Sequence, residues 1–225
     1  MSQPRVLSDK SRSKAEPAPR RGRGRPVGDH AAKRVELLDA AIAVIARDGV
    51  AAASLRKVAQ QAGTSTGAVT YYFANKEEMM AAVIEAQFDI FDAMLKSDDG
   101  KIDIRAGLKR WLDSLSDSES GEYIATFQLL AHARHEPTLA DVYQRRYANY
   151  RQVFASMLAK GQSDGTIRTD VPADLLADQL SAMGDGWMML FPIEPERFHP
   201  SRVQALLDAT MALISPTARQ ARGGG

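Results

Sequence analysis

The chain has 225 residues, of which 44% are hydrophobic and 25% charged, so it can bury a sizeable core in one or two compact domains. It contains no cysteine, which excludes a disulfide framework, a cysteine-liganded metal site and thiol-based redox sensing. No apolar run reaches the roughly 18 to 20 residues that a membrane span requires, and the N-terminus lacks the apolar core of a signal peptide. We therefore expect a soluble, cytoplasmic protein that does not enter a membrane.

Charge is distributed unevenly along the chain. Residues 1–34 carry ten basic and three acidic side chains, a net charge of +7, whereas the whole chain carries +1 and the remainder therefore −6. The arm formed by residues 1–29 has no aromatic side chain and too little apolar surface to offset the entropy of ordering it. We expect this basic arm and the tail 218–225 to be disordered, and the arm to associate with a polyanion.

From residue 30 onward, apolar residues recur at the three- and four-residue spacings of helices, and no useful strand pattern interrupts them. Ser54 is a favourable N-cap, Asn75 and Glu78 form a capping-box-like pair, and Gly63 is placed to end a helix. We predict an all-α protein of about nine helices. Their expected ranges are 30–48, 54–63, 65–73, 75–95, 101–116, 119–134, 137–161, 172–191 and 200–214.

The second and third predicted helices flank a tight turn, residues 62–65, and so have the form of a helix–turn–helix unit. Such a unit places its second helix in the DNA major groove. Gly63 permits the positive φ of the turn, although it would also serve as an ordinary cap in a helical bundle. The third helix is short and polar outward, and the basic arm lies just upstream, so we favour DNA binding.

Candidate DNA contacts follow from this arrangement. Thr66, Gly67 and Thr70 are expected to lie closest to base edges, because short hydroxyl-bearing side chains can reach them. The residues expected to anchor phosphates are Ser54, Ser65, Tyr71, Tyr72 and Lys76. In the arm, Arg21, Arg23 and Arg25 surround an Arg-Gly-Arg-Pro run similar to an AT-hook, which predicts minor-groove binding. A nonspecific polybasic tail is the open alternative for the arm.

Two motifs lie in and after the turn, namely Ala62-Gly63-x-Ser65-x-Gly67 and Tyr71-Tyr72-Phe73-x-x-Lys76-Glu77. On these motifs, residues 38–80 resemble the DNA-binding domain of the TetR/AcrR family of transcriptional regulators. The sequence departs from the family pattern at Thr64, where an apolar residue is usual, and at Thr70, where tyrosine is common. Residues 137–191 are similar, less specifically, to the effector domain of BetI-type members.

The resemblance implies a three-helix DNA-binding domain at 30–78 and an effector-binding and dimerisation domain at 79–217. It implies a homodimer whose last two helices form a four-helix interface, and a small-molecule effector that changes the spacing of the recognition helices and releases the operator. We expect a repressor of this kind, with double-stranded DNA as its partner, and no cofactor. The apolar stripes of helices 172–191 and 200–214 fit such an interface, although burial within one subunit fits them equally. These stripes comprise Leu175, Leu176, Leu180, Met183, Trp187, Val203, Leu206, Leu207, Thr210, Leu213 and Ile214.

An effector pocket between helices needs aromatic and methionine walls, which the C-terminal half supplies. The candidate residues are Trp111, Phe127, Tyr147, Tyr150, Phe154, Met183, Trp187 and Met188. Filling of an ordinary core is the alternative for each of them. His132 and His135 suggest a competing class, a helical metal-dependent enzyme, but no nearby segment offers the third ligand that a catalytic zinc needs. A ligand-independent DNA-binding protein is a further alternative. We therefore expect that the protein is not an enzyme.

Overall fold

The computed structural model describes residues 27–95, 103–117 and 121–217, and in these ranges every regular element is a helix. The predicted basic arm and C-terminal tail lie outside the described residues. The all-α prediction is confirmed, and nine α-helices occur in the described ranges, together with a short 3-10 helix, η1. Their bounds are α1 Val27–Asp48, α2 Leu55–Gln61, α3 Thr66–Tyr72, α4 Lys76–Leu95, α5 Ile104–Asp117, α6 Glu122–Ala133, α7 Pro137–Ser163, α8 Ala173–Leu190, η1 Pro195–Phe198 and α9 Pro200–Ile214.

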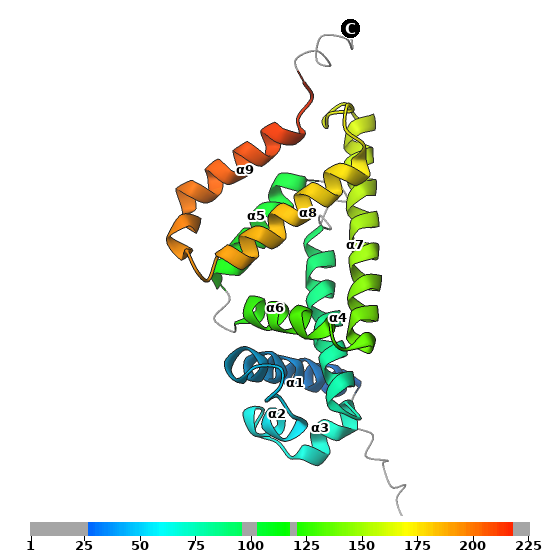
Figure 1. Ribbon diagram of the computed structural model, residues 1–225, viewed down its shortest axis with the longest axis vertical. Coiled ribbons are helices and arrows are strands. Elements are labelled where there is room, and N and C mark those ends of the chain that lie inside the picture. Colours follow the sequence, from blue (N-terminus) through cyan, green and yellow to red (C-terminus); the bar gives the residue numbers. More distant parts are fainter. Residues whose placement is uncertain (1–26, 96–102, 118–120, 218–225) are drawn as a thin grey trace, which may run out of the picture.

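Helices α1 to α3 form one end of the molecule, shown from blue to cyan in Figure 1. Two serine hydroxyls set where α2 and α3 begin: Ser54 Oγ accepts the Lys57 N–H at 3.3 Å, and Ser65 Oγ accepts the Ala68 N–H at 3.1 Å. Between them Gly63 has a φ of +59°, a conformation that side chains with a Cβ rarely adopt. The caps and the glycine therefore fix the angle between α2 and α3.

Helix α4 carries the chain from this end into the C-terminal half (Figure 1). Its start is fixed by the predicted Asn75–Glu78 pair, since Asn75 Oδ1 accepts the Glu78 N–H at 2.7 Å, and Glu78 Oε2 accepts the Ala74 N–H at 2.8 Å. The expected domain boundary, between residues 78 and 79, lies inside the first turn of α4. A continuous hydrophobic core crosses it, uniting for example Leu37 of α1 with Leu129 of α6.

The C-terminal half packs α5, α7, α8 and α9 around two smaller cores. Helix α7 runs along one side of the molecule, α8 crosses diagonally to meet its upper part, and α9 lies on the opposite side (Figure 1). Much of the apolar stripe predicted for a dimer is used inside the subunit, so for these positions the intramolecular alternative holds. The stripe residues buried in this way are Leu176, Leu180, Val203, Leu207, Thr210 and Ile214. Leu175 and Leu213 remain 50% and 60% exposed.

Candidate nucleic-acid interface and ligand cavity

The outer face of α3 is open to solvent. Thr66, Gly67 and Thr70 are all exposed, as is Ser65 at the N-cap. The inner face packs through Val69, which is fully buried against the rest of the DNA-binding end. The Thr70 hydroxyl donates to the Gly67 carbonyl at 3.0 Å, which leaves its lone pairs facing outward along a helix only seven residues long. A short helix that packs through one buried valine can place its opposite, polar face in a DNA groove.

An aromatic cluster joins the start of α1 to the end of α3. The His30 ring lies 4.6 Å from the Tyr72 ring and 5.8 Å from the Tyr71 ring, measured between centroids. Tyr72 is half-buried by this packing, whereas Tyr71 is 73% exposed. Because α1 begins at Val27, the chain enters the fold beside the end of α3. Arg21, Arg23 and Arg25 lie outside the described residues.

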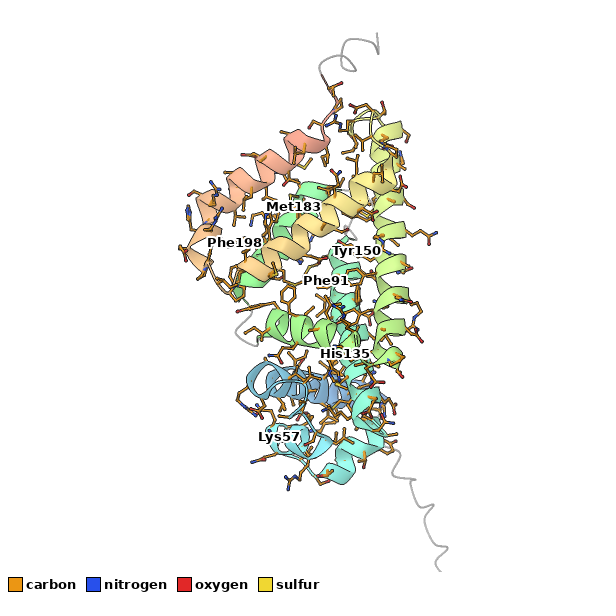
Figure 2. The ribbon with its side chains drawn as sticks, viewed as in Figure 1. Lys57, Phe91, His135, Tyr150, Met183 and Phe198 are labelled. Carbon is orange, nitrogen blue, oxygen red and sulfur yellow. The ribbon has the colours of Figure 1, made fainter. Side chains whose placement is uncertain are left out.

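Three of the five predicted phosphate anchors take part in local hydrogen bonds. The Ser54 and Ser65 hydroxyls cap helices, and the Lys76 Nζ donates to the Ala51 carbonyl at 3.1 Å. Lys57, labelled in Figure 2, reaches Asp48 Oδ2 at 2.8 Å. Side-chain hydrogen bonds from Arg47 and Lys57 hold the pKa of Asp48 well below its usual range. These hydrogen bonds restrict the conformations of the side chains at this end of the molecule.

A cavity lies between α4, α5, α7 and α8, and part of its boundary is open to solvent. Figure 2 shows Phe91 of α4 and Tyr150 of α7 near one another in this region. A mostly aromatic and aliphatic lining with a few polar groups is typical of sites that bind small organic molecules. Its lining residues are Phe88, Phe91, Met94, Asp103, Ile104, Gly107, Leu108, Trp111, Tyr147, Tyr150, Phe154, Met157, Leu180, Ser181, Gly184, Asp185 and Met188.

Five of the eight sequence-derived pocket candidates line this cavity, namely Trp111, Tyr147, Tyr150, Phe154 and Met188. The other three pack elsewhere. Trp187 stacks on Trp111 with a centroid separation of 6.4 Å, and Phe127 belongs to the same small core. Met183 faces α9, where its Sδ lies 3.9 Å from the Thr210 hydroxyl. The α4 side of the wall and the polar groups of α8 were not among the sequence candidates.

The polar groups of the cavity are concentrated where α7 meets α8. Partial burial of the Asp185 carboxylate raises its pKa to about 6, although the residue as a whole is exposed at the cavity edge. Burial, followed by the charge of Asp185, raises the pKa of both Tyr147 and Tyr150 to about 12. The Ser181 Oγ is buried and has no hydrogen-bond partner among the residues that the structure describes. The corner between α7 and α8 therefore contains polar groups that can still form hydrogen bonds, whereas most of the cavity wall is apolar.

An arginine on α7 ties this helix to α4 next to the cavity. The Arg146 side chain is only 16% exposed, and its guanidinium lies 2.7 Å from Asp89 and 3.1 Å from Asp92. It also lies 3.4 Å from Glu85 and 5.5 Å from the centre of the Phe88 ring, which lines the cavity. The position of α4 is therefore coupled to α7 by charge as well as by packing.

The histidine pair that suggested a metal site lies at the α6–α7 corner. His132 is in the last turn of α6, and the backbone N–H of His135, labelled in Figure 2, donates to the His132 carbonyl at 3.0 Å. Across the residues that the structure describes, no group of three or more metal-ligating side chains comes together. In the same residues, no helix has the length and apolar character needed to cross a membrane.

An exposed helix–turn–helix joined by one helix to an aromatic cavity defines the class of ligand-binding transcriptional regulators. Two family models agree: bacterial regulatory proteins of the tetR family match residues 37–83, and the BetI-type transcriptional repressor C-terminal domain matches residues 103–215. Because together they cover more than half of the chain, it belongs to the TetR family of bacterial transcriptional regulators, with a BetI-type C-terminal domain. The resemblance seen in the sequence motifs is confirmed.

Similar proteins span nearly the same length. The nicotine-responsive transcriptional repressor HdnoR of Paenarthrobacter nicotinovorans is 32% identical over 187 residues, which are 79% of this chain and 93% of that protein. The transcriptional repressor Rv1474c of Mycobacterium tuberculosis is 27% identical over 182 residues, 80% and 92% of the two chains. A triclosan complex of SmeT, the repressor of a Stenotrophomonas maltophilia multidrug efflux pump, has a TM-score of 0.70 at 26% identity and covers 83% of this chain and 93% of its own.

Proposed function

We propose that this chain acts in the cytoplasm as a repressor that binds a pseudo-palindromic operator as a homodimer and leaves it when a small-molecule effector fills the cavity. One observation carries the proposal: α4 begins beside α3 and ends in the cavity wall (Figure 1). Phe88, Phe91 and Met94 on its second half line the cavity. A ligand that displaces these side chains tilts α4, and α3 moves with it.

The effector part of the proposal is supported by two relatives. The name of HdnoR describes a repressor that responds to nicotine, and SmeT was solved with triclosan. Both are small organic molecules with aromatic rings, which suits the aromatic and apolar lining of the cavity in this chain. A ligand-independent DNA-binding protein would have no use for a cavity that costs packing energy in its effector domain.

The homodimer is supported by an exposed apolar face of α8. Leu175, Ala182 and Met189 are spaced by seven residues and therefore lie on one side of the helix, with Leu175 50% and Met189 52% exposed. Gly186 lies on the same side, and a Cβ built on it would meet nothing within 4 Å. An alanine and a glycine between larger apolar residues allow a second helix to approach closely. Leu213 on α9 is also apolar and 60% exposed, whereas the exposed Asp178 interrupts the apolar face of α8 between Leu175 and Ala182.

In this complex Thr66, Gly67 and Thr70 lie against base edges, and the tyrosines, capping serines and Lys76 lie along the phosphates. The two copies of α3 enter successive major grooves about 34 to 36 Å apart. The proposal also includes Arg21, Arg23 and Arg25 of the basic arm as contacts to the adjacent minor groove.

Selection of bound sequences from a random DNA pool tests the proposal directly. We expect a consensus of two inverted half-sites separated by about one helical turn, and a dimer by light scattering. Small molecules are then screened for release of the selected site. A consensus without two-fold symmetry, or a chain that selects no sequence, contradicts the proposal.

A further inference from the structure

The cavity contains a carboxylate among aromatic rings. Asp185 lies at the edge of α8 that faces α7, where its charge acts on both Tyr147 and Tyr150. The other cavity carboxylate, Asp103, is already engaged, because its Oδ1 accepts the Ala106 N–H at 2.9 Å at the start of α5. Asp185 is thus the acidic group that the fold leaves to a ligand.

Two polar groups of α8 lack partners at this corner. In the part of the chain that the structure describes, no hydrogen bond or ion pair engages the Asp185 carboxylate. One turn earlier, the Ser181 Oγ is buried without a hydrogen bond and also lines the cavity. Asp185 is itself exposed, so water can hydrate its carboxylate while the cavity is empty. A ligand that fills the cavity displaces this water, and the carboxylate then needs a hydrogen-bond partner from the ligand.

The rest of the wall suits a positive charge attached to an apolar body. The rings of Phe91, Trp111 and Tyr150 face the same space, and ring faces attract cations. Met94 and Met157 add adaptable apolar surface for the remainder of a ligand. A neutral ligand would leave Asp185 unpaired, and an anionic one would be repelled by it.

We propose that the cavity selects a protonated amine carried on an apolar or aromatic body, whose N–H donates to the Asp185 carboxylate while Ser181 completes the polar contacts. This inference rests on the proposed function, since it specifies the chemical class of the effector. It distinguishes an amine that has an N–H from a quaternary ammonium ion, which can place charge near Asp185 but cannot donate a hydrogen bond.

Three matched probes test the inference. N,N-dimethylphenethylamine is the protonated amine, N,N,N-trimethylphenethylammonium is the quaternary ion, and 3-methylbutylbenzene is the neutral carbon isostere of the first. The chain has two tryptophans, and Trp111 lines the cavity, so intrinsic fluorescence reports binding. We expect the amine to bind most tightly, the quaternary ion next and the hydrocarbon most weakly.

The Asp185→Asn variant removes the charge and keeps the shape. We expect it to weaken binding of the amine by about 10- to 100-fold, the range of a charge-assisted hydrogen bond, and to leave the hydrocarbon nearly unaffected. The matched control is Asp178→Asn on the same helix, where the carboxylate lies outside the cavity and 3.6 Å from Arg151. This control should bind all three probes like the original chain. Circular dichroism confirms that both variants are folded.

Equal binding of the amine and the hydrocarbon, no binding of the amine, or equal losses in the two variants would overturn the inference. Tighter binding of the quaternary ion than of the amine would overturn its N–H component. None of these measurements uses DNA. A chain that selects the amine but no operator contradicts only the proposed function, and a chain that binds its operator but does not prefer the amine contradicts only the present inference.

Discussion

The Asp185→Asn variant should also change the stability of the ligand-free protein in a pH-dependent way. Burial raises the pKa of Asp185 from the ordinary 3.8 to about 6, so the folded state binds a proton more tightly than the unfolded state. Below about pH 4, Asp185 is protonated in both the folded and the unfolded state, so the variant is no more stable than the original chain. Between about pH 4 and 6 the original chain loses stability relative to the variant, and above pH 6 the full difference is reached.

The size of this difference follows from the pKa and from the exposure of the carboxylate. The change from 3.8 to about 6 corresponds to at most about 3 kcal/mol. Because the side chain still reaches solvent at the cavity edge, we reduce this to about 1 kcal/mol. That value raises the melting temperature by about 2 to 4 °C for a chain of this length.

Urea unfolding of the original chain, Asp185→Asn and Asp178→Asn at pH 4, 5 and 7.5 measures the effect. Other groups facing the site are Tyr147, Tyr150 and Arg151 of α7, Asp92 of α4, and Asp103 just before α5. Tyr147 and Tyr150 have pKa values of about 12 and therefore stay neutral throughout this pH range. A gain that is absent at pH 7.5, or equal at all three pH values, would refute the reasoning. A gain shared by Asp178→Asn would show a general charge effect instead.

Four further predictions concern the DNA-binding end and its link to the cavity. Lys76→Ala should weaken binding to all DNA sequences alike and reduce the slope of log affinity against log salt by about 1, measured by fluorescence anisotropy. Thr70→Val should change the selected bases, whereas Thr138→Val, at an exposed position on α7, should leave the consensus unchanged. Gly63→Ala should lower the free energy of unfolding by about 1 kcal/mol, because alanine is strained at the positive φ of this position while the added Cβ meets no atom within 4 Å. A loss above about 3 kcal/mol would contradict this reasoning, since it would require a steric clash. Arg146→Met should lower the free energy of unfolding by about 2 kcal/mol at low salt and by less at high salt, because it removes a cation shared by three carboxylates of α4. A loss of stability that does not depend on salt would contradict this explanation.

Much of the fold follows from local signals in the sequence. Ser54 and the Asn75–Glu78 pair act through residues three or four positions away, so their effect on helix starts is visible without tertiary structure. The exposed face of α3 follows in the same way, because Val69 is its one buried residue and helical geometry places the threonines opposite. The second half of α9 shows the limit. Its apolar stripe predicts burial, but periodicity does not tell whether the covering surface belongs to the same subunit or to another.

The cavity was harder to predict because its lining and an ordinary core need the same kinds of side chain. Trp111 and Trp187 look equivalent in the sequence, yet only Trp111 reaches the cavity, and Trp187 stacks behind it. Asp185 gives no periodic signal, since a charged residue in a helix usually faces solvent. The sequence does show an acidic residue one turn after Ser181, next to small residues on an otherwise apolar helix. Whether that residue faces a cavity depends on the position of α7, which the sequence pattern does not give.

The hydrophobic core that joins α1 to α6 and α7 has a consequence for how such regulators are recombined. Leu37 and Ile45 of α1 share one packed interior with Leu129 and Leu139 of the sensing half. A chimera that grafts the DNA-reading end of this chain onto the sensor of a relative would meet a foreign surface at α6. Exchange of DNA-binding domains in this fold therefore requires that the residues packed between α1 and α6 be exchanged together. A DNA-binding domain transferred without α6 would pack poorly against the recipient's effector domain.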